Sequence, residues 1–174
     1  MNSGLPESQK QSQQSCQRSD SADDRWIFVV HALNRPGTLT DAAAVFSNRG
    51  VSLENFLGSG IDTNSVEDGR LLLSFRATQE KKDLLKRSLQ RLPSVLKVRE
   101  YAFSDERLRL VAVVKLSLDA QTDVADLLYV ETISCDKTTR LQLMTGRATV
   151  VESAIAHLRE QAQLKDVVVS AITV

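Results

Sequence analysis

The chain has 174 residues, of which 42% are hydrophobic and 25% are charged. This length suits one domain or two small ones and excludes a large multi-domain enzyme. The 22 Lys and Arg residues balance the 22 Asp and Glu residues, so the formal net charge is zero. Nucleic-acid binding requires clustered positive charge. The densest basic group is typical of an ordinary helix face and comprises Lys81, Lys82, Lys86 and Arg87.

Histidine and cysteine are too scarce to predict a metal site or a disulfide framework. There are two of each, without CxxC or HxxxH spacing. We expect Cys16 and Cys135 to be thiols in a cytoplasmic protein, with Cys135 half-buried in a strand. No nucleophile or carboxylate pair is placed to work with His31, so we expect no catalytic residue and no cofactor. Neither a membrane span nor a signal peptide is predicted.

The first 24 residues are dominated by Ser, Gln and charged side chains. Such a segment cannot bury enough apolar surface to offset the entropy lost on ordering. We therefore predict a disordered polar tail at residues 1–24. Two domains are expected to follow, at residues 25–104 and 105–174.

An apolar, β-branched run at residues 25–32 predicts a strand, which ends at the sequence Asn-Arg-Pro-Gly. The pair Thr38 and Asp41 predicts a capped helix directly after it, and Gly50 is expected to end that helix. The next strand starts at residue 51, and we expect Gly58 and Gly60 to belong to a hairpin loop that ends at residue 69. A strand at 70–77, a helix at 79–92 and a strand at 96–103 complete this half.

The same order of elements starts again at residue 108. We expect strands at 108–118, 129–135, 139–145 and 166–174, with at most two helical turns at 122–128. Thr149 and Glu152 offer a capping box for a helix that carries one apolar stripe. The chain is therefore predicted to be α+β, with two tandem ferredoxin-like βαββαβ units. Each unit has antiparallel strands, helices on one face, and an open face and edge that a second unit or a dimer partner can cover.

The turn between the first strand and the first helix, residues 34–39, is the candidate site. A helix N-terminus carries unpaired N–H groups and the positive end of the helix dipole, which together attract anions. The amides of Gly37, Thr38 and Leu39 can thus hold a carboxylate, and Asn34 adds a donor and an acceptor. The alternative is a simple turn, in which Pro36 and Gly37 only set the backbone geometry.

The run NRPGTLTDAAAVFSNRGVSLENFLGS resembles the opening of an ACT domain, and in particular that of the regulatory (small) subunit of acetolactate synthase. The resemblance covers residues 25–103 at motif level. Over residues 108–174 it rests on the order of the elements and on Met144-Thr145-Gly146. The residues that match the family's typical run in register are Asn34, Arg35, Pro36, Gly37, Phe46, Ser47, Arg49, Gly50, Leu53 and Glu54.

This resemblance implies a non-catalytic regulatory subunit that binds and activates a thiamine-diphosphate-dependent large subunit. It implies a homodimer whose N-terminal ACT domains bind a branched-chain amino acid, usually valine, between two chains. On one side the ligand would meet the loop, with Ser52 and Leu53 contributed by the partner chain. The loop residues carried over are Asn34, Pro36, Gly37, Thr38 and Leu39. The equivalent loop of the second unit, residues 118–121, lacks Pro and Gly, so we expect no amino-acid site there.

Two other functions fit the sequence. One is a free-standing two-ACT amino-acid sensor that regulates some other protein. The other is a small enzyme on a ferredoxin-like scaffold, since this fold hosts many functions. A convergent set of ionisable residues would favour the enzyme, and the sequence does not supply one.

Overall fold

The computed structural model describes residues 23–60, 69–120 and 128–173. Residues 1–22 of the predicted tail lie outside this part, and Asp24 already belongs to the first strand. The first unit consists of β1 (Asp24–Ala32), α1 (Thr38–Ser47), β2 (Leu53–Gly60), β3 (Gly69–Ala77), α2 (Gln79–Gln90) and β4 (Val95–Ala102). Its strands lie in the order β2-β3-β1-β4, and all neighbours are antiparallel.

The second unit repeats this plan with β5 (Arg109–Ser117), β6 (Leu128–Cys135), β7 (Thr139–Arg147), α3 (Ala148–Glu160) and β8 (Leu164–Ile172). Its strand order, β6-β7-β5-β8, matches that of the first unit. The predicted tandem ferredoxin-like fold is therefore confirmed. The helical turns expected at 122–128 fall outside the described residues, except for Leu128, which begins β6 instead.

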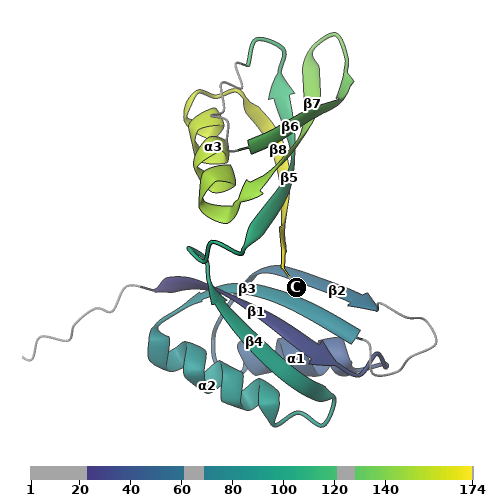
Figure 1. The fold of residues 1–174 in the computed structure, drawn as a ribbon, viewed down its shortest axis with the longest axis vertical. Helices are drawn as coiled ribbons and strands as arrows, with labels where there is room; N and C mark the ends of the chain where they lie inside the picture. Colours follow the sequence, from purple (N-terminus) through teal and green to yellow (C-terminus); the bar gives the residue numbers. More distant parts are fainter. Residues whose placement is uncertain (1–22, 61–68, 121–127, 174) are drawn as a thin grey trace, which may run out of the picture.

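Helices α1 and α2 cover one face of the first sheet (Figure 1). Phe28 on β1, Phe46 on α1 and Phe75 on β3 meet there edge to face, with ring centroids 4.8 to 6.5 Å apart. Gly50 has a φ of 62°, and the amide of Val51 donates to the carbonyl of Phe46. This left-handed turn ends α1 where the sequence predicted it.

The other face of the first sheet packs against the second unit, which stands across it in Figure 1. Ile27 and Val29 of β1 belong to the same apolar cluster as Leu108 and Leu110 of the second unit. Polar contacts surround this junction: the Arg25 guanidinium pairs with Glu54 of β2 and Glu152 of α3. The Asn55 amide also donates to the Val169 carbonyl at 2.6 Å.

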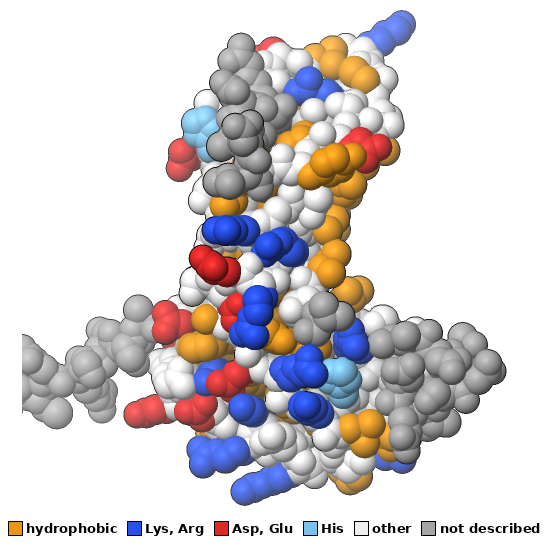
Figure 2. Space-filling model, viewed as in Figure 1, with side chains coloured by type: hydrophobic (Ala, Val, Ile, Leu, Met, Phe, Trp, Pro, Cys, Tyr) orange, Lys and Arg blue, Asp and Glu red, His pale blue; other side chains and the backbone are white. Residues whose placement is uncertain are grey.

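The second sheet is covered on one face by α3, and its opposite face is open. Tyr129 is 60% exposed and Val168 is 69% exposed on that open face. Figure 2 shows hydrophobic side chains gathered along the side of this unit that lies opposite α3. Within one chain, these strands therefore bury the apolar side chains that face α3 and leave apolar side chains on the opposite face exposed.

Neither capping box forms as predicted. The N-cap of α1 is Gly37 and the N-cap of α3 is Arg147, and neither cap makes a side-chain hydrogen bond. Thr38 turns its hydroxyl back to the loop, and Glu152 pairs with Arg25 across the junction. Thr38 thus bonds within its own loop, whereas Glu152 bonds to a group that the tertiary fold brings near.

The assignment of Lys82 to an ordinary exposed helix face is also wrong. Its side chain is 2% exposed, and its Nζ lies 4.6 Å from the centroid of the Trp26 ring. The ammonium pairs with Asp83 at 2.9 Å and with Glu100 at 3.0 Å. A buried ammonium is tolerated here because two carboxylates and an aromatic face replace its water.

Glu100 accepts hydrogen bonds from Lys82 and is paired with Lys86 at 3.0 Å. Partial burial acts to raise its pKa, but the bonds from Lys82 and Lys86 outweigh burial, so the pKa lies below its ordinary value. A carboxyl group with a lowered folded pKa stabilises the fold above its unfolded pKa. That contribution is lost as the pH falls through the folded pKa.

We therefore expect the free energy of unfolding to decrease as the pH is lowered below about 4, and less steeply in Glu100→Gln than in the wild type. Urea denaturation between about pH 7 and about pH 3 measures this slope. Glu160→Gln, an exposed change at the end of α3, is the control and should keep the wild-type slope. Equal slopes for wild type and Glu100→Gln would contradict the prediction.

Candidate functional site

The loop between β1 and α1 is closed by its own hydrogen bonds. The Thr38 hydroxyl donates to the Leu33 carbonyl at 2.9 Å, and the Thr38 amide donates to the Arg35 carbonyl at 3.3 Å. Gly37 has a φ of 90°, a conformation that strongly favours glycine. The loop therefore turns sharply onto the start of α1 and holds Thr38 nearly buried.

The expected row of three free amides at this helix start is thus reduced. The Thr38 amide is engaged within the loop. Across the described residues, the amides of Gly37 and Leu39 donate no hydrogen bond. These two N–H groups, at the positive end of the α1 dipole, are what remains of the predicted anion site.

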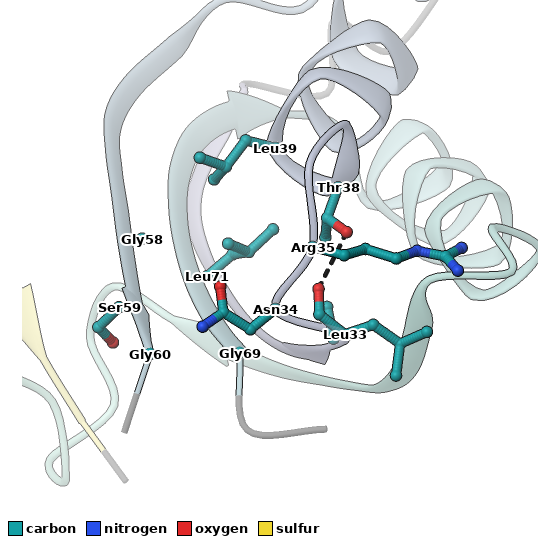
Figure 3. Close-up of a pocket in the computed structure, with 11 residues that line it drawn as sticks. Leu33, Asn34, Arg35, Thr38, Leu39, Gly58, Ser59, Gly60, Gly69 and Leu71 are labelled. Carbon is teal, nitrogen blue, oxygen red and sulfur yellow. Dashed lines mark hydrogen bonds between the residues drawn. The ribbon is translucent and has the colours of Figure 1, made fainter. Parts of the chain in front are cut away.

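A cavity of about 170 Å³ lies between this loop and strands β2 and β3 (Figure 3). Three of the predicted site residues, Asn34, Thr38 and Leu39, line it, whereas Pro36 and Gly37 do not. The Asn34 side chain points towards β2, while Arg35 extends away from the cavity. The complete lining is Ala32, Leu33, Asn34, Arg35, Thr38, Leu39, Gly58, Ser59, Gly60, Gly69 and Leu71.

Ser52 and Leu53 lie elsewhere in the chain. They line a separate hollow at the start of β2, together with Phe46 and Gly50. The sequence assigned them to the partner's side of the site. Within one chain they do not line the cavity beside the loop.

Three glycines allow the cavity to form. A Cβ on Gly58 would lie 3.1 Å from Cδ2 of Leu39, and one on Gly60 would lie 2.6 Å from Nδ2 of Asn34. A Cβ on Gly69 would lie 2.7 Å from the Ala32 carbonyl oxygen. The glycines thus let the loop approach β2 and β3 closely.

Sequence reasoning missed this role of the glycines. It placed Gly58 and Gly60 in a hairpin loop, but β2 continues to Gly60 and β3 begins at Gly69. The available signal was their spacing of two, because residues two apart in a strand share one face. Two glycines on one face mark a close approach of other groups to that face.

The cavity has an apolar wall and a polar wall. Leu71 is buried and Leu39 is 49% exposed, so an isobutyl group lies beside the opening. The Asn34 amide and the loop backbone form the polar wall. Among the described lining residues the only ionisable side chain is Arg35, so no acid-base pair is available. The cavity therefore suits binding of a small, partly apolar molecule.

The other residues that the sequence singled out, His31, His157 and Cys135, do not line the cavity. His31 faces Arg70 and Lys97 on the neighbouring strands. His157 is exposed, as predicted, and its Nε2 lies 2.8 Å from Nε2 of Gln161. Cys135 is exposed on the edge strand β6, which corrects the expectation of a half-buried thiol.

Within the described ranges, no group of three or more His, Cys, Asp or Glu side chains is placed to hold a metal ion. None of the described helices has the length and apolar character needed to cross a membrane. In the second unit, the carbonyl of Ala120 accepts a hydrogen bond from Arg140 at 2.7 Å. The absence of an amino-acid site at residues 118–121 stays a prediction, since Gln121 lies outside the described residues.

No protein-family model and no curated protein sequence matches the chain. Among solved structures, the fold is similar to the acetolactate synthase small subunit of Thermotoga maritima, with a TM-score of 0.65 and 18% identity. This match covers 85% of the chain and 96% of the Thermotoga chain. The regulatory subunit of aspartate kinase from Thermus thermophilus matches with a TM-score of 0.43 and 15% identity, covering 80% of the chain and 92% of that subunit. The first likeness extends over both units and confirms the predicted fold, whereas the second is too distant to carry an argument.

Proposed function

We propose that the chain is a non-catalytic, cytoplasmic regulatory subunit that binds a branched-chain amino acid, valine, at the cavity beside residues 34–39. It modulates a thiamine-diphosphate-dependent acetolactate synthase catalytic subunit in branched-chain amino-acid biosynthesis. The observation that carries the proposal is the cavity itself, which is lined by the Asn34 carboxamide, by Leu71 and by Leu39, whose amide donates no hydrogen bond among the described residues. The similarity of the fold to the Thermotoga small subunit supports the choice of partner.

The cavity chemistry matches an aliphatic amino acid. The free amide of Leu39, which lines the cavity, and the positive end of the α1 dipole attract the ligand carboxylate. The side-chain carbonyl oxygen of Asn34 accepts a hydrogen bond from the ligand ammonium, and Leu71 contacts the isopropyl group. A volume of about 170 Å³ is below the roughly 300–1,000 Å³ of sites for drug-sized ligands. It therefore restricts the ligand to a molecule of amino-acid size.

In this proposal a homodimer completes the site. Strand β2 is an edge strand, so one side of its backbone has no partner within the described sheet. Phe56 is 39% exposed and Leu57 is 45% exposed on the same strand. Pairing of two such edges would bury these side chains and bring Ser52 and Leu53 of the partner chain towards the loop.

Regulation then follows from a shift of population. An effector that binds one dimer geometry more tightly than another favours that geometry, and the catalytic partner senses the difference. Such effects typically amount to ~1–3 kcal/mol, so the regulation is graded. No lining residue has to take part in catalysis.

The effector is tested by calorimetric titration with valine, leucine, isoleucine and glycine. We expect valine to bind the wild type, and Asn34→Ala or Gly60→Ala to weaken binding by at least about tenfold, the loss of about 1.4 kcal/mol. Asn34→Ala removes the side-chain carboxamide, whereas a methyl group at position 60 displaces that carboxamide. Asn48→Ala, an exposed change at the end of α1, should bind as the wild type does. Silence with all four amino acids, or unchanged binding in Asn34→Ala, would contradict this assignment.

The dimer is tested by sedimentation of Phe56→Lys. A lysine on the β2 edge places like charges opposite each other in the paired strands, so we expect the dimer to dissociate. Leu96→Lys is the matched control, because Leu96 is 53% exposed on β4 at the opposite edge of the sheet. A dimer that persists in Phe56→Lys, or dissociates only in Leu96→Lys, would rule out pairing through β2.

The partner is tested by adding the purified chain to an acetolactate synthase catalytic subunit from the same cell. We expect a higher rate of acetolactate formation with the chain present, and a loss of that gain when valine is added. An unchanged rate together with intact valine binding would overturn the choice of partner. That outcome would favour the alternative, a free-standing two-ACT sensor of another protein.

A further inference from the structure

The junction between the two units contains a further hollow, with a volume of about 440 Å³. Arg25 of β1 forms one side, and residues of β5, α3 and β8 form the others. None of its lining residues also lines the cavity beside the loop. The two hollows are therefore separate on one chain, and a ligand of the junction hollow is independent of the proposed function.

Two opposite charges on α3 face this hollow. Glu152 and Arg159 are seven residues apart, which places them on the same face of the helix. The side chain of Glu152 is 47% exposed, and one of its oxygens, Oε1, pairs with Arg25. In the part of the chain that the structure describes, the Arg159 guanidinium makes no hydrogen bond or ion pair.

The space between these charges is apolar. Ala156 lies between Glu152 and Arg159 on α3, and its single methyl group leaves the hollow open. Leu110 of β5, Ile155 of α3 and Val167 of β8 supply branched aliphatic walls. The hollow thus combines a separated pair of opposite charges with an aliphatic surface.

We propose that this junction hollow binds an aliphatic α-amino acid as its zwitterion. The ligand carboxylate pairs with the guanidinium of Arg159, in the fork geometry that arginine offers to carboxylates. The ligand ammonium pairs with the oxygen of Glu152 that Arg25 leaves free. The aliphatic side chain packs on Leu110, Ile155 and Val167, and the burial of its apolar surface favours binding.

The two charges on α3 select the zwitterion. Arg25 already pairs with Glu54 and Glu152, so the groups open to a ligand are the second oxygen of Glu152 and the Arg159 guanidinium. A ligand with only a carboxylate would leave the second oxygen of Glu152 without an ammonium partner and would place two carboxylates near each other. A ligand with only an ammonium would face Arg159 instead. Each single-charge ligand therefore loses one attraction and meets one repulsion.

The test is a titration of the full chain followed by ¹H–¹⁵N NMR. The probes are L-leucine, 4-methylpentanoate, which lacks the ammonium, and 3-methylbutylamine, which lacks the carboxylate. We expect L-leucine to shift the amide signals of residues 152–159 and 167–169 in a saturable way. Both analogues should bind there at least tenfold more weakly.

Two variants address the site directly. Arg159→Gln removes the cation, and Ala156→Leu fills the space while keeping every charge, so both should abolish the shifts at residues 152–159. Arg91→Gln, beyond the end of α2, and Ser153→Leu, an exposed position of α3 outside the lining, are the matched controls. Circular dichroism establishes that each variant is folded.

The possible outcomes are distinct. Shifts confined to residues 34–39 and 58–60 would overturn the junction site while leaving the loop cavity in place. Equal binding of 4-methylpentanoate and L-leucine would overturn the selection of a zwitterion. Wild-type binding by Arg159→Gln would overturn the role of that side chain.

Discussion

Strand β1 is apolar on both of its faces, and this requires a layer on each side of the first sheet. Ile27, Phe28, Val29 and Val30 are each 0% exposed. Two of them face the helices, while Ile27 and Val29 face the second unit. Burying a side chain of this size contributes roughly 1.5–3 kcal/mol. The second unit therefore contributes to the core of the first. The two apolar faces of β1 require both the junction and the helical layer.

The sequence predicted the elements well because their signals are local. The β-branched run of β1, the leucine stripe of α2 and the left-handed turn at Gly50 depend on neighbours within one or two turns. The order of the elements then led to a tandem ferredoxin-like fold. Within the candidate site, the loop at 34–39 was found through its Pro-Gly turn, and Asn34, Thr38 and Leu39 do line a cavity.

The errors concern side chains whose partners are far away in sequence. Glu152 was assigned to a helix cap, but it pairs with Arg25, which lies 127 residues earlier. Lys82 was assigned to the surface, but Trp26 and Glu100 surround it. Gly58 and Gly60 were assigned to a loop because the side chains that need their space, Leu39 and Asn34, belong to another element. No local pattern encodes the contacts of Glu152 and Lys82, whereas the spacing of two between Gly58 and Gly60 was a local signal for a strand face that other groups approach closely.

Strand β2 serves two parts of the molecule at once. Its first half holds the second unit through Glu54 and Asn55, and its second half forms a wall of the loop cavity with Gly58 and Gly60. A ligand that displaces β2 must therefore change the free energy of the junction. Thermodynamic linkage makes this effect reciprocal: a change at the junction that favours one position of β2 would change the affinity of the cavity for the proposed ligand. Under the proposed function, substitutions in the second unit would therefore alter the response to the ligand without touching it.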